Sequence, residues 1–399
     1  MIKKLGKKSD KKCIFNLLLN LFTTIILLSL FLIGLFLTGC SQSQTPTGNI
    51  AALDSEKNQI NQIDVGIILP LTGNFAFYGN DAYQGILLAE EELENKYGDI
   101  FTLYIEDHQA NPTLGVNAFV KLKDSNNINA VITGMSPVSV AVSSLVKEKD
   151  IIQMAVFSST PKYTSLHDNT FRLTTVSEVE DYYVAKTIKK DYNTVGILYI
   201  NNDMGLGHKV SFLKSFVQMD GDVIIEGAYN QEQLDFRTNL LKIKNKHPEA
   251  LYIVGDAVTS GLIIKQAAEL QLNIPLFASR AVEDEQLFSI AGNAAEGLVF
   301  TTAFDVNGNN EDLQDFVKRY RNKYITDPTD FSAQGYEAGK LLFSALHVCN
   351  AETVCTRNYL FKIKDLSTVF GPLSFDENGD VMYPFMIKEV KNGKFVVIK

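Results

Sequence analysis

The polar side chains best suited to binding chemistry lie in two hydroxyl-rich loops. The first spans residues 133–139, where Ser136 and Pro137 stand between a strand-like run and a helix-like run. Serine is a good N-cap, and proline suits the first helical position because its missing N–H would have no partner there. The free N–H groups and the positive end of the helix dipole then predict a carboxylate site at Ser136. An ordinary capped helix is the alternative.

Two further loops also follow apolar runs and could face the same ligand. Residues 158–161, Ser-Ser-Thr-Pro, offer three hydroxyls that could complete a polar clamp. Residues 71–79 place Tyr78 just ahead of a helical pattern at 81–96, where its ring could form an apolar lid. Alternatively, Tyr78 packs on that helix as a hydrophobic staple.

Sequence signatures of enzymes are missing. There is no Gly-x-Gly-x-x-Gly after a strand, no Walker loop, no Gly-x-Ser-x-Gly and no His-Glu-x-x-His. No histidine has another histidine at metal-ligand spacing, so all five are interpreted as surface or capping residues: His108, His167, His208, His247 and His347. We therefore expect a binding protein with no catalytic residue, no cofactor and no metal site.

The N-terminus predicts export and lipid attachment. A lysine-rich start precedes an uncharged run at residues 14–36, which ends in Leu37-Thr38-Gly39-Cys40. This order is typical of a secretory signal, and the last four residues resemble a bacterial lipobox. Residues 1–39 are predicted to be a lipoprotein signal peptide, Cys40 the lipidated residue and residues 40–63 a flexible tether. A plain transmembrane helix is the alternative, and it too leaves the rest of the chain outside the cytoplasm.

Length and charge restrict the remaining possibilities. The residues after the tether are too many for one ordinary core, so two domains are expected. The whole chain has a net charge of −9, and residues 1–39 hold six Lys and one Asp, so the mature chain has a net charge of −14. An acidic surface argues against nucleic acid as a partner.

Two cysteines remain in the mature chain besides Cys40. Cys349 and Cys355 lie six positions apart, and an oxidising compartment favours a local disulfide between them. Free thiols are one alternative. A metal site with His347 is another, although a structural zinc site needs a fourth ligand that is not visible nearby.

The remaining sequence alternates β-branched runs with amphipathic runs. Strand-like and helix-like segments alternate from residue 65 to 157 and again from 179 to 300, and the C-terminus reads as a hairpin through Asn392-Gly393. This order predicts an α/β fold with mostly parallel sheets covered on both faces. Such sheets bind ligands beyond the carboxyl ends of their strands, where the loops described above lie.

Residues 64–399 resemble the leucine/isoleucine/valine-binding proteins, the type I periplasmic binding proteins of ABC importers. The matching segments are 71–79, 134–139, 158–161, Phe171-Arg172, 290–297 and 370–380. The resemblance implies two doubly wound parallel-sheet lobes joined by three crossovers. Lobe 1 would hold residues 64–176 plus 303–383, and lobe 2 residues 177–302 plus 384–399.

The resemblance also implies roles for four residues of lobe 1. Ser136 would bind a ligand carboxylate, and the backbone carbonyl of Phe157 would accept from a ligand ammonium. Ser159 would bind through its hydroxyl and main chain, and Tyr78 would cover the ligand side chain.

Lobe 2 departs from the pattern of amino-acid-binding members. Met204 stands where the family often has Tyr, and Arg280 stands where a Glu commonly pairs with the ammonium. Arginine cannot accept a hydrogen bond. Asp256 could supply the missing negative charge, and Arg280 would then hold Asp256 or a second acidic group on the ligand.

The expected function is capture of a small amino acid or related small polar metabolite for an ABC importer, with a dicarboxylate or an amide-like solute as alternatives. The protein would work as an extracytoplasmic monomer, anchored to the membrane by the lipid on Cys40, with a membrane permease as its partner. The competing function is a ligand-sensing receptor that signals without transport.

Overall fold

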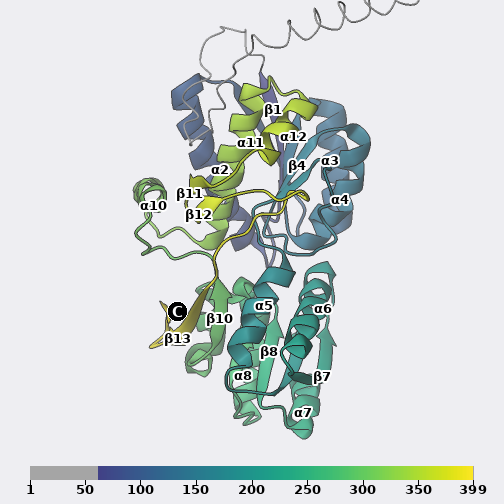
Figure 1. Ribbon diagram of the computed structural model, residues 1–399, viewed down its shortest axis with the longest axis vertical. Helices are drawn as coiled ribbons and strands as arrows, with labels where there is room; N and C mark the ends of the chain where they lie inside the picture. The colour runs from purple at the N-terminus through teal and green to yellow at the C-terminus, as the bar shows by residue number, and fades with distance from the viewer. Residues whose placement is uncertain (1–61, 399) are drawn as a thin grey trace, which may run out of the picture. The chain divides into compact units, whose positions relative to one another are not determined.

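The computed structural model describes residues 62–398, so the predicted signal peptide, Cys40 and nearly all of the tether lie outside the described residues. The described residues belong to one compact unit. Two sheets organise it, and we call the part built on the first sheet lobe 1 and the part built on the second lobe 2 (Figure 1).

The sheet of lobe 1 has five parallel strands in the order β2-β1-β3-β4-β5. They are β1 (Ile63–Leu69), β2 (Phe101–Asp107), β3 (Ala130–Gly134), β4 (Ile152–Val156) and β5 (Thr170–Arg172). The connecting helices are α2 (Ala76–Tyr97), α3 (Pro112–Asn126) and α4 (Ser136–Lys149). Strands β1, β3 and β4 are buried almost throughout, and their sequences are mostly apolar, with Asp64, Thr133 and Gln153 as the polar members.

The sheet of lobe 2 has the order β14-β13-β10-β9-β8-β6-β7. Its parallel strands are β6 (Thr194–Ile200), β7 (Asp222–Tyr229), β8 (Ala250–Val254), β9 (Leu276–Ala278) and β10 (Val299–Thr302). Its helical segments are α5 (Ser177–Ile188), α6 (Asp203–Gln218), α7 (Arg237–Lys246), α8 (Ala257–Glu269), η2 (Arg280–Val282), α9 (Gln286–Ala291) and η3 (Gly292–Ala295).

The C-terminal hairpin of the chain completes the sheet of lobe 2. Strands β13 (Met386–Lys391) and β14 (Lys394–Val397) are antiparallel, and β13 pairs antiparallel with β10. The turn is Asn392-Gly393, with φ of 53° and 66°, as its two-residue length requires. The Asn-Gly prediction is confirmed.

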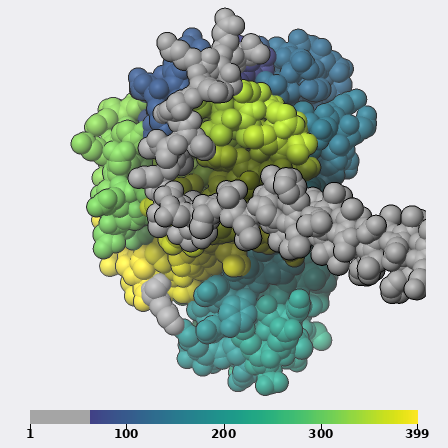
Figure 2. Space-filling view, turned by 45° about the horizontal axis from the view of Figure 1, so that its top comes forward, coloured from purple at the N-terminus to yellow at the C-terminus, as the bar shows by residue number. Residues whose placement is uncertain are grey.

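The chain between β10 and β13 returns from lobe 2 to lobe 1. It forms α10 (Glu311–Tyr324), α11 (Asp330–Val348), α12 (Thr353–Phe361) and the small hairpin β11 (Leu366–Thr368) and β12 (Gly371–Leu373). In the space-filling view, C-terminal residues in yellow lie between the lime-green residues of α11 and the teal residues of lobe 2 (Figure 2). The sheet membership supports crossings after β5, after β10 and before β13, and the exact lobe boundaries stay a prediction.

Helix α11 joins the core of lobe 1 from far along the sequence. Its residues Leu342, Phe343 and Leu346 are buried with Ile86 of α2 and Phe101 of β2. Burying one such side chain stabilises the fold by about 2 kcal/mol. After α11, Cys349 and Cys355 form a disulfide with a Cα–Cα distance of 5.5 Å.

Several helices begin earlier than their apolar spacing predicts. The sequence patterns place starts at Asp81 and His208, whereas α2 begins at Ala76 and α6 at Asp203. Six residues separate β1 from α2 and two separate β6 from α6, so both loops are shorter than expected. As a result Tyr78 and Met204 lie in first helical turns and not in loops.

Candidate functional site

A cavity of about 60 Å³ lies where the two lobes meet, at the carboxyl ends of their parallel strands. Its lining residues are Phe75, Tyr78, Met135, Ser136, Pro137, Phe157 and Phe331 from lobe 1, and Ile200, Asn202, Met204, Asp256 and Ala281 from lobe 2. Five of the seven predicted ligand-binding residues are among them: Tyr78, Ser136, Phe157, Met204 and Asp256. Ser159 and Arg280 are not.

Aromatic rings form the wall of the cavity in lobe 1. The ring centroid of Phe331 lies 4.3 Å from that of Tyr78 and 5.7 Å from that of Phe157. The ring centroids of Phe75 and Tyr78 are 6.1 Å apart. The Phe157 ring lies against Gly134, where an added Cβ would come within 2.5 Å of Phe157 Cζ. This wall suits the apolar part of a solute.

Tyr78 joins the two lobes directly. Its hydroxyl donates to the carbonyl oxygen of Ala281 at 3.0 Å and accepts from the N–H of Ala257 at 3.2 Å. Burial and the nearby Asp256 carboxylate raise the pKa of Tyr78 well above its usual value, so the phenol stays protonated. The lid expectation is therefore incomplete, because the tip of the ring is fixed to lobe 2.

Ser136 is buried at the start of α4, but it is not the N-cap. Met135 takes that position with φ 69°, and Ser136 is the first helical residue, followed by Pro137. The Ser136 Oγ accepts from the backbone N–H of Ser159 at 3.1 Å and of Thr160 at 3.4 Å. Because the oxygen is used in this way, its O–H remains as a donor for an anionic group.

Ser159 is not among the residues that line the cavity, and its predicted contact with a ligand stays a prediction. Its Oγ lies 3.0 Å from His208 Nε2, and His208 Nδ1 lies 3.1 Å from an Asp181 oxygen. Asp181 also accepts from the Tyr252 hydroxyl at 2.7 Å. The order of groups matches that of a serine hydrolase triad, but Ser159 is buried and does not line the cavity between the lobes.

The histidines were predicted to be surface or capping residues, but His208 and His108 are only 2% and 0% exposed, and His108 accepts the backbone N–H of Ala110 at 3.0 Å. Burial alone would lower the pKa of His208, but attraction to Asp181 and Glu180 outweighs it and raises the pKa to about 9. Burial lowers the pKa of His108 to about 4, so this imidazole is neutral. The two buried histidines therefore carry different charges at neutral pH.

Asp256 is the charged residue among the cavity-lining set. One carboxylate oxygen accepts from the N–H of Thr259 at 2.9 Å and the other from its hydroxyl at 2.8 Å, which caps α8. Within residues 62–398 no cation pairs with it. Burial raises its pKa, because an unpaired charge away from water is unfavourable. A ligand amine would relieve this penalty.

Within residues 62–398, no group of three or more His, Cys, Asp and Glu side chains is arranged to hold a metal ion. Over the same residues, no helix combines the length and the apolar character of a membrane span.

Comparison with known proteins identifies the fold and the family. The sequence profile described as periplasmic binding protein matches residues 62–394. This chain belongs to the periplasmic binding protein family. It is a type I member of the leucine/isoleucine/valine-binding kind. The predicted family and the predicted α/β fold with two sheets are therefore confirmed. The family consists of solute-binding proteins and not of enzymes.

Individual relatives cover almost the whole binding module. The Leu/Ile/Val-binding protein homolog 2 of Brucella abortus is 26% identical over 341 residues, which are 83% of this chain and 91% of that protein. The leucine-binding protein LivK from Thermotoga maritima is 25% identical, with a TM-score of 0.80 over 84% of this chain and 98% of that one. A solute-binding protein from R. palustris, solved with benzoate, is 22% identical, with a TM-score of 0.78 over 85% of this chain and 96% of that one.

Arg280 of this periplasmic binding protein pairs with an acidic residue other than Asp256, and its predicted contact with an acidic group of the ligand stays a prediction. Its guanidinium pairs with Asp330 of α11, and its backbone N–H donates to Glu180 at 2.8 Å. The next residue, Ala281, lines the cavity in its place.

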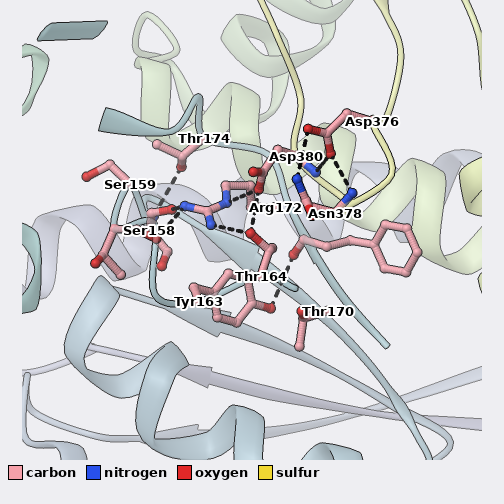
Figure 3. Close-up of polar contacts among 12 residues, drawn as sticks. Ser158, Ser159, Tyr163, Thr164, Thr170, Arg172, Thr174, Asp376, Asn378 and Asp380 are labelled. Carbon is pink, nitrogen blue, oxygen red and sulfur yellow. Dashed lines mark hydrogen bonds and ion pairs between the residues drawn. The ribbon is translucent and has the colours of Figure 1, made fainter. Parts of the chain in front are cut away.

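Arg172, recognised in the sequence only as part of a shared motif, anchors the 158–164 loop (Figure 3). Fully buried, it donates to the carbonyl oxygens of Ser158 at 3.0 Å and Thr160 at 2.8 Å, and to the Thr164 hydroxyl at 2.6 Å. Its Nε lies 2.5 Å from Asp380, which comes from the returning C-terminal chain. The contacts of Arg172 therefore fix the backbone N–H groups of Ser159 and Thr160, which donate hydrogen bonds to Ser136 Oγ.

Phe331 and Ala281 line the cavity without having been predicted. Phe331 lies in the first turn of α11, about 250 residues from Tyr78 in sequence, and no motif marks it. Ala281 directly follows Arg280, which departs from the family pattern. That departure is the only feature of the sequence discussed above that points to the position of Ala281. The predicted contact between the Phe157 carbonyl and an ammonium stays a prediction.

Proposed function

We propose that this protein captures a small amino acid or a related small polar solute outside the cytoplasm and delivers it to an ABC importer. The observation that supports this function best is the cavity shared by the two lobes, whose polar groups come from both sides. Solute binding between lobes is what couples capture to closure, because each lobe contributes contacts that exist only when the lobes meet.

The chemistry of the cavity favours a solute with three parts. The Ser136 hydroxyl at the start of α4 suits a carboxylate, and the unpaired Asp256 carboxylate suits an amine. The aromatic wall suits an apolar body between them. The complexes of relatives agree in part, since a Streptococcus pneumoniae LivJ was solved with isoleucine and the R. palustris protein with benzoate, a carboxylate without an amine.

The lipid on Cys40 would hold the protein at the membrane surface beside its permease. Residues 40–63 would then act as a tether that leaves the lobes free to move. Mass spectrometry of the membrane-extracted protein tests this, because a processed N-terminus at Cys40 carrying acyl chains is expected, and a chain that begins elsewhere would contradict it.

A thermal-shift panel tests the capture function. The chain from Ser41 onward, which contains the whole compact unit, is melted with α-amino acids, dicarboxylates, amides and aromatic carboxylates. A solute at one hundred times its Kd stabilises the folded state by about 2.7 kcal/mol. No shift with any solute would contradict the proposal.

Two variants assign the ends of the solute. Ser136→Ala should weaken every carboxylate, whereas Asp256→Asn should weaken amines selectively and leave amine-free carboxylates unchanged. Asp284→Asn is the matched control, because Asp284 is a partly buried carboxylate near Tyr78 that does not line the cavity. Equal losses in Asp256→Asn and Asp284→Asn would argue against an amine on Asp256.

A further inference from the structure

A chain of buried polar contacts leads from Arg280 in lobe 2 to the backbone of Phe157 in lobe 1. The Arg280 guanidinium pairs with Asp330. The paired Asp330 oxygen also accepts from Gln334 Nε2 at 2.7 Å, and Gln334 Oε1 accepts from the Phe157 N–H at 2.8 Å. Asp330 and Gln334 of α11 thus connect Arg280 of lobe 2 to the backbone of Phe157, a residue of the cavity wall.

The two intermediate side chains have little freedom. Asp330 and Gln334 are one helical turn apart, and Thr329 fixes the start of their helix through a capping box. Gln334 is fully buried, and its Oε1 also accepts from the Thr174 hydroxyl at 2.6 Å. Because the amide oxygen must face Phe157 and Thr174, the amide nitrogen must face Asp330.

Phe157 needs such a support. Its φ is 38°, in a region where residues other than glycine are uncommon and are held by their surroundings. Its ring forms part of the aromatic wall beside Phe331. A change at the Gln334 amide would therefore move a group that lines the cavity.

The lobe 2 end of the chain is equally fixed. Arg280 is 8% exposed, and its N–H donates to Glu180, which also accepts from the Thr301 hydroxyl at 3.2 Å. The guanidinium of Arg280 pairs with the buried Asp330 carboxylate. Its positive charge offsets the cost of removing that carboxylate from water. Separation of the lobes would leave Asp330 without its cation.

We propose that Arg280 is a positioning residue that sets the conformation of Phe157 through Asp330 and Gln334 when the lobes meet. Closure of the lobes thereby shapes the aromatic wall of the cavity. The relevance of this wall to a solute rests on the proposed function, whereas the coupling between Arg280 and Phe157 does not.

The test uses a double variant, Arg280→Met with Asp330→Asn, which removes the ion pair without leaving an unpaired buried charge. The control is Lys209→Met with Glu226→Gln, an ion pair whose two members lie in α6 and β7 of lobe 2. The backbone amide of Phe157 is followed by NMR after labelling with ¹⁵N-phenylalanine and is assigned by its loss in Phe157→Leu.

The expected result is a displaced Phe157 amide signal in the Arg280 double variant and an unmoved one in the control. Solute affinity should fall by about tenfold in the first and stay unchanged in the second. Arg280→Lys, which keeps a cation beside Asp330, should restore part of the wild-type signal.

An unmoved Phe157 amide in a folded Arg280 double variant would overturn the proposal, and so would an equal displacement in both double variants. If no solute binds the wild-type protein, the proposed function fails, but the amide measurement still decides the coupling.

Discussion

The hydroxyl oxygen of Tyr78, in the first turn of α2, lies 3.0 Å from the carbonyl oxygen of Ala281 in the other lobe. The same oxygen accepts the N–H of Ala257 at the start of α8. One phenol therefore joins the apolar wall of lobe 1 to two backbone groups of lobe 2, beside the cavity.

Tyr78→Phe should weaken solute binding while preserving the wall. The variant keeps the ring but removes two hydrogen bonds between the lobes, each contributing about 1 kcal/mol. Calorimetric titration should therefore show a loss of affinity of about tenfold or more. Tyr182→Phe, at an exposed ring 44% accessible to solvent, is the control and should bind like the wild type. Unchanged affinity in Tyr78→Phe would show that these bonds do not favour closure.

Gly134→Ala should disturb the cavity through Phe157. The added methyl carbon would lie 2.5 Å from Phe157 Cζ and 2.9 Å from Leu69 Cδ2, so the ring must move. Overpacking of this kind lowers the free energy of unfolding by about 1–3 kcal/mol. Urea denaturation checks the stability, and the solute panel checks the binding.

Gly196→Ala is the control for this substitution, because its added carbon would approach Ile225 no closer than 3.1 Å, away from the cavity. A smaller loss of stability and normal binding are expected there. If Gly134→Ala binds solutes normally, the position of the Phe157 ring does not limit binding.

His208 should make stability depend on pH in the alkaline range. Its pKa in the folded protein is about 9, above the ordinary 6.5, so the folded state binds the proton more tightly than the unfolded state. The stabilisation is full below pH 6.5 and is lost as the pH rises through about 9. The change in unfolding free energy should not exceed about 3 kcal/mol.

His208→Gln is the reference for this measurement, because an amide can still bond to Ser159 but does not titrate. The difference in melting temperature between wild type and variant should shrink between pH 7 and pH 10. A constant difference over this range would mean that the folded-state pKa of His208 is not raised.

The disulfide should contribute measurably to stability. Replacing Cys349 and Cys355 by serine opens a short loop, and the chain-entropy relation gives a loss of about 2 kcal/mol. Reduction of the wild type should lower its melting temperature to that of the double variant. The double variant should not respond to reductant, since the chain from Ser41 onward has no other cysteine.

Local patterns were sufficient to predict most of the fold. Continuous apolar runs gave the buried parallel strands, and Asn392-Gly393 gave the terminal hairpin, because both depend on neighbours in sequence. The rule that ligands bind beyond strand ends led to Ser136 and Tyr78, whereas Phe157, Met204 and Asp256 came from the family resemblance. The short strands β5 and β9 were not predicted, since three residues carry too little periodicity.

Ser159 and Arg280, the two predicted site residues that do not line the cavity, share a physical reason for their position. Ser159 is bonded to His208 and Arg280 to Asp330, 49 and 50 positions further along the chain. Which distant group takes up a polar side chain depends on the folded arrangement and not on the local sequence. For the same reason Phe331 could not be predicted, because only the packing of α11 on α2 brings it to Tyr78.

The return of residues after β10 to lobe 1 restricts the order in which this protein can fold. The core of lobe 1 includes Leu342, Phe343, Phe370 and Phe375, and the sheet of lobe 2 is completed by β13. A chain that emerges N-terminus first therefore cannot finish either core until nearly all of it is available. Such long-range closure makes folding slow, and the chain stays extended longer before either lobe is complete.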